Sequence, residues 1–177
     1  TDSRCDGHGL PVMVWLYGGA FQTGSTCEKE FNGEQLARQG VVVVSIAYRL
    51  NVFGFFAHAM LEKEAVDGRP CANFGFLDQR MGIQWVKDNI ALFGGDPANI
   101  TVFGQSAGAA SALAQSVSPM NDGLFQRVIM QSGGGTGLFN RHLWSLEDAQ
   151  RNGARFWKLN RLPRRVLFLR LICWRRR

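Results

Sequence analysis

The sequence lacks any run of eighteen or more uncharged apolar residues, so it predicts no helix that spans a membrane. Its first residues, TDSRCDGHGLP, lack the charged start and the apolar stretch of a signal peptide. Only four cysteines occur, widely spaced, and no CxxC motif or Cys/His cluster indicates a zinc or redox site. We therefore predict a protein without a metal, a cofactor or a transmembrane segment.

Acidic residues are absent from residues 161–177, which contain seven arginines. The rest of the chain carries 13 basic and 14 acidic groups, so the net charge of +6 comes from this tail alone. A body without excess positive charge gives no support to a nucleic-acid partner. The tail also lacks turn signals, and Pro163 blocks a helix that would enter it. We predict that it is not part of the fold; the alternative is a basic amphipathic segment on a membrane surface.

The remaining residues, 1–160, have a length and composition that suit one globular domain. The chain starts with Thr1 and not with Met, from which we expect a piece of a longer protein. Nothing in the sequence predicts the oligomeric state.

Short apolar runs alternate with longer helical ones along this domain. Strands are predicted over 11–17, 41–48, 99–103 and 127–131 and helices over 78–93 and 107–116. The VVVVSIAY run is apolar on both faces, as expected where helices cover both sides of a sheet. Asp78 is the candidate N-cap of the first helix. The order predicts an α/β fold with a mainly parallel sheet and helices on both faces.

A Gly-x-Ser-x-Gly motif lies between the third strand and the Ala-rich helix, with Gly104, Gln105, Ser106, Ala107 and Gly108 in order. At such a junction the chain must turn sharply, and glycines on both sides relieve the crowding around the serine. The serine Oγ then projects above the edge of the sheet. We therefore predict that Ser106 is a nucleophile.

A second glycine-rich segment, Tyr17-Gly18-Gly19-Ala20-Phe21, follows the first strand directly. Acyl transfer needs backbone N–H groups that point at the developing oxyanion, and small residues let a substrate approach them. Gly19, Ala20 and Ala107, the residue after the nucleophile, are the candidate donors. The alternative is an ordinary Gly-Gly turn.

Residues 93–108, FGGDPANITVFGQSAG, resemble the serine signature of the type-B carboxylesterases, the cholinesterase and bile-salt-activated-lipase family. YGGAFQTG is similar to the oxyanion loop of that family, in which Ala20 can replace a third glycine because a backbone N–H is what matters. The resemblance implies that 1–160 is part of an α/β-hydrolase domain, incomplete at its ends. It also implies a small-molecule ester or lipid substrate, and secretion.

Two positions depart from the family pattern. Gln105 stands where the family usually has Glu, and Phe31 stands where a Tyr often bonds that Glu. A carboxylate beside the serine would favour a cationic transition state, so its absence predicts neutral esters and not choline esters. Because the Tyr hydroxyl and the Glu carboxylate of that hydrogen bond are both absent here, no acceptor is left unsatisfied.

The family order places an acid and then a histidine far downstream of the serine. Here His8 and His58 precede Ser106, and His142 follows it closely. None of them suits the role of general base, so we expect this chain alone to be inactive. The alternatives to an esterase fragment are a non-catalytic, cholinesterase-like binding or adhesion domain and an inactive truncated product.

Overall fold

The computed structural model describes residues 9–62, 72–133 and 144–160. The strands are β1 (Leu10–Leu16), β2 (Val42–Ser45), β3 (Gly95–Gln105) and β4 (Arg127–Gln131). The α-helices are α1 (Glu34–Ala37), α2 (Asn51–Phe55), α3 (Ala59–Glu62), α4 (Phe74–Asn89), α5 (Ala107–Ser116) and α6 (Leu146–Leu159). Short 3-10 helices cover Lys29–Phe31, Ile90–Phe93 and Pro119–Asn121.

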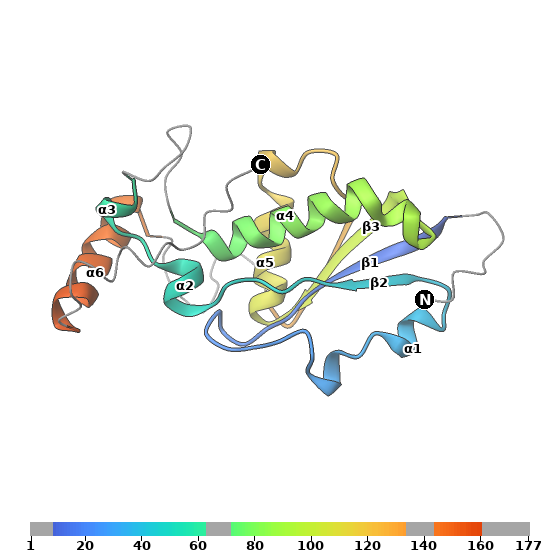
Figure 1. The fold of residues 1–177 in the computed structure, drawn as a ribbon, viewed down its shortest axis with the longest axis horizontal. Helices are drawn as coiled ribbons and strands as arrows, with labels where there is room; N and C mark the ends of the chain where they lie inside the picture. The colour runs from blue at the N-terminus through green and yellow to red at the C-terminus, as the bar shows by residue number, and fades with distance from the viewer. Residues whose placement is uncertain (1–8, 63–71, 134–143, 161–177) are drawn as a thin grey trace.

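The four strands form one sheet in the order β2-β1-β3-β4, and every neighbouring pair is parallel. Val14 in β1 pairs with Val44 on one side and with Val102 on the other. Parallel neighbours need crossover connections, and α4 and α5 supply two of them. The carboxyl ends of β1, β3 and β4 therefore lie at one edge of the sheet (Figure 1).

One face of the sheet packs against α4 and α5. The apolar side chains of this layer are buried and include Val12, Val14, Leu16, Val42, Ile83, Val86, Ile100, Val102 and Ala112. The small side chains of α5 let this helix approach the strands closely, because Ala107, Ala109 and Ala112 are fully buried.

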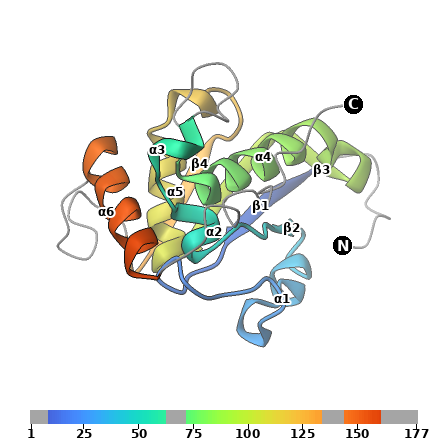
Figure 2. The ribbon, with the colours of Figure 1, turned by 60° about the vertical axis from the view of Figure 1, so that its left-hand side comes forward.

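The opposite face carries aromatic side chains. Trp15, Tyr17, Tyr48 and Phe103 form a second buried cluster, and Phe31 packs on Trp15 with 5.2 Å between ring centroids. Gly33 lies against Val43, so the short α1 that follows it starts over this face. Figure 2 shows α1 on the side of the sheet away from α4, which agrees with the prediction of helices on both faces.

Helix α6 packs beside α2 and α3, away from the sheet (Figure 1). Gly153 lies against the carbonyl oxygen of Ala57, where a side chain would not fit. Ser145 caps the helix by accepting a hydrogen bond of 3.1 Å from the Asp148 N–H.

The predicted bounds of β4 and α5 are confirmed, and β1 differs by one residue at each end. Helix α4 is a correction, because it begins at Phe74 and not at Asp78. Asp78 is therefore no N-cap; its carboxylate accepts bonds from the Arg49 guanidinium, with Arg49 Nε to Asp78 Oδ2 at 2.7 Å. The predicted tail over 161–177 lies outside the described residues and stays a prediction.

Candidate active site

Ser106 stands at the junction between β3 and α5, at the edge where the parallel strands end. Its φ of 55° and ψ of −119° lie in a region that residues with a side chain rarely adopt. The Ser106 N–H donates to the Gln131 carbonyl oxygen at 2.9 Å, and the Ser106 carbonyl accepts the Ala110 N–H at 3.1 Å. The sharp turn is thus fixed by β4 on one side and by the first helical bond on the other.

The glycines that flank Ser106 are required by close backbone contacts. A Cβ on Gly104 would lie 2.7 Å from the Leu16 carbonyl oxygen and would overlap the backbone of Gly108. A Cβ on Gly108 would overlap that same oxygen and lie 2.9 Å from the Tyr17 carbonyl carbon. The spacing of the two glycines therefore lets the first turn of α5 pack directly on the end of β1.

Because the Ser106 backbone is strained, we expect Ser106→Gly to raise the free energy of unfolding by about 1 kcal/mol. Strain of this kind costs about 1–3 kcal/mol, and the greater freedom of unfolded glycine offsets about 0.5–1 kcal/mol of the relief. Ser106→Ala is the matched control, since it keeps Cβ and should change stability by less than about 0.5 kcal/mol. Urea unfolding of the three chains checks this, and equal stability of both variants would show that Cβ is not strained.

The glycine loop, residues 17–24, crosses beside the serine. A Cβ on the buried Gly18 would lie 3.2 Å from the Ser106 Cβ and 2.8 Å from the Gln105 carbonyl oxygen. The fold therefore brings together the two motifs that the sequence singled out.

A tight turn shapes this loop after Gly18. Ala20 and Phe21 both have positive φ, and the Gly19 carbonyl accepts the Gln22 N–H at 2.9 Å and the Thr23 N–H at 3.1 Å. Positive φ at both central residues is typical of a type I′ turn. The turn leaves Gly19 and Ala20 exposed.

The far end of the loop is held by Phe21. Its ring packs against Phe55 of α2 and Phe76 of α4, with centroid separations of 4.9 and 5.6 Å. Its carbonyl oxygen accepts the Asn51 N–H at 2.7 Å. These contacts tie the exposed turn to two helices, so its backbone N–H groups have a fixed direction.

In the part of the chain that the structure describes, the three candidate donors are not used by the fold itself. Among the described residues, the N–H groups of Gly19, Ala20 and Ala107 have no hydrogen-bond acceptor. Ala107 is the first residue of α5, where a helix leaves its N–H groups unpaired and carries partial positive charge. N–H groups of this kind are suited to a developing oxyanion.

Comparison with known proteins identifies the family. Residues 2–154 match the carboxylesterase family. The chain belongs to this family. It is 43% identical over 145 residues to fumonisin B1 esterase of Sphingopyxis macrogoltabida, covering 82% of this chain and 26% of that protein. It is 50% identical over 133 residues to bile salt-activated lipase of Mus musculus, covering 71% of this chain and 21% of that protein.

A solved structure supports the same family. A thermophilic PNB esterase superposes with a TM-score of 0.75 at 38% sequence identity and covers 90% of this chain and 31% of its own. The fold is thus the α/β-hydrolase fold of this carboxylesterase relative, with four parallel strands described here. This carboxylesterase chain spans about a quarter of the length of the curated relatives it matches.

The two residues that depart from the family pattern, Phe31 and Gln105, lie on the aromatic face of the sheet. Phe31 is half-buried on Trp15, and the Gln105 Oε1 lies 3.2 Å from the position of a Cβ on Gly18. The Trp15 indole N–H is buried and has no partner among the described residues. Gln105 therefore lies beside the glycine loop and next to Ser106. A charged side chain at this position would act on both candidate motifs.

The histidine that the structure describes, His58, has a structural role. Its Nδ1 accepts the Met60 N–H at 3.1 Å at the start of α3, and its ring stacks on Phe56 at 5.9 Å. It also lies 6.3 Å from the Trp157 ring of α6. His8 and His142 lie outside the described residues.

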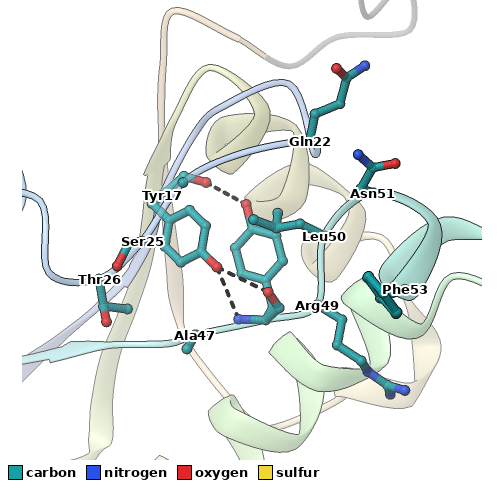
Figure 3. A pocket seen from close by; sticks show the side chains of 11 residues that line it. Tyr17, Gln22, Ser25, Thr26, Ala47, Arg49, Leu50, Asn51 and Phe53 are labelled. Atoms are coloured by element: carbon teal, nitrogen blue, oxygen red, sulfur yellow. Dashed lines mark hydrogen bonds between the residues drawn. The ribbon is translucent and has the colours of Figure 1, made fainter. Parts of the chain in front are cut away.

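A surface cleft of about 550 Å³ lies behind the glycine loop and is lined by residues of the loop and of the segment 47–53. Figure 3 shows the side chains that line it, with Gln22 from the glycine loop and Asn51 from the start of α2. Ser106 does not line this cleft. In the described ranges no cluster of three or more metal-ligating side chains occurs, and no helix is long and apolar enough to cross a membrane.

Sequence reasoning missed the interactions that hold the glycine loop from outside its own motif. Tyr17 and Tyr48 stack with 4.4 Å between centroids, and Arg49 pairs with Asp78. The signal available was the polar run Tyr48-Arg49 directly after an apolar strand, at the edge of the sheet where the serine also lies.

Proposed function

We propose that this carboxylesterase chain carries the nucleophile and the oxyanion hole of a serine carboxylic ester hydrolase. The observation that supports it best is the strained backbone of Ser106, with positive φ, between β3 and α5, with Gly18 against its Cβ. A strained serine at a strand-to-helix junction is the geometry of a nucleophile elbow. The alternative of an ordinary Gly-Gly turn does not account for the contact between the two motifs.

In the proposed reaction, the Ser106 Oγ attacks the ester carbonyl carbon and loses its proton to a general base. The carbonyl oxygen becomes an oxyanion that accepts hydrogen bonds from the Gly19, Ala20 and Ala107 N–H groups. Collapse of this intermediate releases the alcohol, which takes the proton, and leaves an acyl-serine. Water then attacks the acyl-serine, and the acid is released as Ser106 regains its proton.

We propose that the general base and its acid partner lie outside these 177 residues, so that this chain alone reacts slowly. His58 is no candidate for this base, because its contacts among the described residues are with Met60, Phe56 and Trp157 and not with Ser106. In serine proteases without a working triad, the oxyanion hole and binding still give about 10³–10⁴-fold over water. As an esterase, this chain alone is therefore expected to be inactive, and Ser106 should react only slowly and with a reactive probe.

The experiment that tests this proposal is labelling with a fluorophosphonate, followed by peptide mass analysis. We expect the label on Ser106 and its loss in Ser106→Ala. Ser116→Ala, on the exposed end of the same helix, should be labelled like the wild type. Labelling that is unchanged in Ser106→Ala would overturn the proposed nucleophile.

The same reaction tests where the base lies. Without a histidine base, the labelling rate should keep rising with pH as the serine ionises, with no plateau near pH 7. A plateau with an apparent pKa near the usual histidine value would show that the chain contains a working base.

We propose secretion on the basis of the family resemblance. For the substrate we propose neutral carboxylic esters, including lipid esters. Gln105 adds no charge beside the glycine loop, so it offers no anion to a cationic alcohol group. In the complete enzyme, Gln105→Glu should raise kcat/KM for choline esters relative to neutral esters of the same acyl length. An unchanged ratio of the two kcat/KM values would show that Gln105 does not determine the choice of substrate.

A further inference from the structure

Tyr17, the first residue of the glycine loop, stacks on Tyr48, which follows β2. Each of these two tyrosines binds the backbone of the other. The Tyr48 hydroxyl donates to the Tyr17 carbonyl oxygen at 2.6 Å, and the Tyr17 hydroxyl donates to the Tyr48 carbonyl oxygen at 3.1 Å. Their rings lie 14° from parallel with centroids 4.4 Å apart. The dashed lines in Figure 3 mark the bonds at Tyr17. Tyr17 immediately precedes Gly18, so the bond from Tyr48 holds the start of the glycine loop.

The Tyr17 backbone that Tyr48 binds packs against the nucleophile helix, because a Cβ on Gly108 of α5 would lie 2.9 Å from the Tyr17 carbonyl carbon. Ser111, fully buried on α5, is among the groups that act on the pKa of Tyr48, which burial raises well above its ordinary value. The Ser111 Oγ donates to the Ala107 carbonyl oxygen at 2.9 Å and accepts the Gln79 Nε2 at 2.9 Å. Ala107 is the residue after Ser106 and the candidate donor on the helix side.

One hydroxyl therefore binds the backbone segment at which the glycine loop contacts α5. Resting on the proposed function, we propose that Tyr48 is a positioning residue, whose hydroxyl fixes the glycine loop relative to the first turn of α5. It binds the Tyr17 carbonyl oxygen, and the Tyr17 backbone packs on Gly108 in the first turn of α5, next to Ala107. Donors that must converge on one oxygen lose effect when their spacing changes, since the geometry of an oxyanion hole is fixed before reaction.

The buried setting supports a fixed spacing. Tyr48 and Ser111 are 6% and 0% exposed, so water does not replace a missing bond at low cost. Gln79 is held in turn by Gln115, whose Nε2 donates to the Gln79 Oε1 at 3.1 Å. A tyrosine hydroxyl is protonated, and therefore a donor, at neutral pH, and burial raises the pKa of Tyr48 further.

The experiment compares Tyr48→Phe with Tyr17→Phe in the 177-residue chain. Each variant removes one buried hydroxyl from the same ring pair, but the Tyr17 hydroxyl binds Tyr48 and not the glycine loop. The first measurement is amide hydrogen exchange at Gln22 and Thr23, whose N–H groups bind the Gly19 carbonyl. The second is the rate constant of fluorophosphonate labelling at Ser106.

We expect Tyr48→Phe to speed exchange at Gln22 and Thr23 about tenfold more than at Val14 in the sheet, and to slow labelling about tenfold. Tyr17→Phe loses two bonds to the Tyr48 backbone and should lower stability across the sheet, but it should slow labelling, and speed loop exchange relative to Val14, by less than about twofold. Equal effects of the two variants, or a rise in exchange that is uniform across the sheet, would overturn the positioning role. A wild-type chain without label at Ser106 would instead refute the proposed function, while the exchange data still decide whether Tyr48 holds the loop.

Discussion

A Gly108→Ala chain is expected to be less stable than the wild type by about 3 kcal/mol or more. In an ordinary helix this substitution stabilises by about 1 kcal/mol, because alanine has the higher helix propensity. Here the added methyl would overlap the Leu16 carbonyl oxygen and press on the Tyr17 carbonyl carbon. Both are backbone atoms at the end of the central strand β1, so relief requires α5 to move away from the sheet.

Urea unfolding measures this difference, with Gly123→Ala as the matched control. Gly123 has a φ of +74° but open space around its Cβ position, so the control measures the backbone cost of alanine alone, about 1 kcal/mol. Helical Gly108 has no such φ cost, and its entire loss would come from the steric contact. A Gly108→Ala chain as stable as Gly123→Ala would mean that α5 packs less closely on β1 than the structure shows.

Local signals explain which elements were predicted well from the sequence. The bounds of α5 follow from the Gly-x-Ser-x-Gly turn before it and its run of alanines, and β4 ends where Ser132 begins a glycine run. The start of α4 was wrong because Asp78 has the residue type of an N-cap. Its carboxylate is used by Arg49, 29 positions earlier, and no local pattern distinguishes the two uses.

In the candidate site, too, the local motifs were predicted from the sequence and the contacts between distant residues were not. Ser106 and the glycine loop were predicted because each motif is local, and the carboxyl ends of parallel strands meet at one edge. The contact of Gly18 with Ser106 depends on the register of β1 against β3, which single strands do not specify. The Tyr17–Tyr48 bonds span 31 positions and join two strand ends, so they follow from the tertiary fold alone.

The ion pair between Arg49 and Asp78 joins the segment after β2 to α4, next to the anchors of the glycine loop. Asp78 accepts the Arg49 backbone N–H at 3.0 Å and two guanidinium bonds at 2.7 Å each. The two side chains are only 35% and 22% exposed. Removing one partner of a buried pair costs about 3–5 kcal/mol, and partial exposure reduces this, so we expect Asp78→Ala to lose about 2–3 kcal/mol.

The pair between Glu34 and Arg38 is the control for this prediction. Its atoms are also 2.7 Å apart, but the Arg38 and Glu34 side chains are 67% and 55% exposed, so Glu34→Ala should cost less than about 0.5 kcal/mol. Thermal unfolding at two salt concentrations separates the two cases, because salt screens the exposed pair more strongly. A similar small loss in both variants would show that Asp78 contributes no more than a surface charge. A large loss at Asp78 alone would show that the segment carrying Tyr48 depends on α4 for its position, as the bonds from Arg49 to Asp78 require.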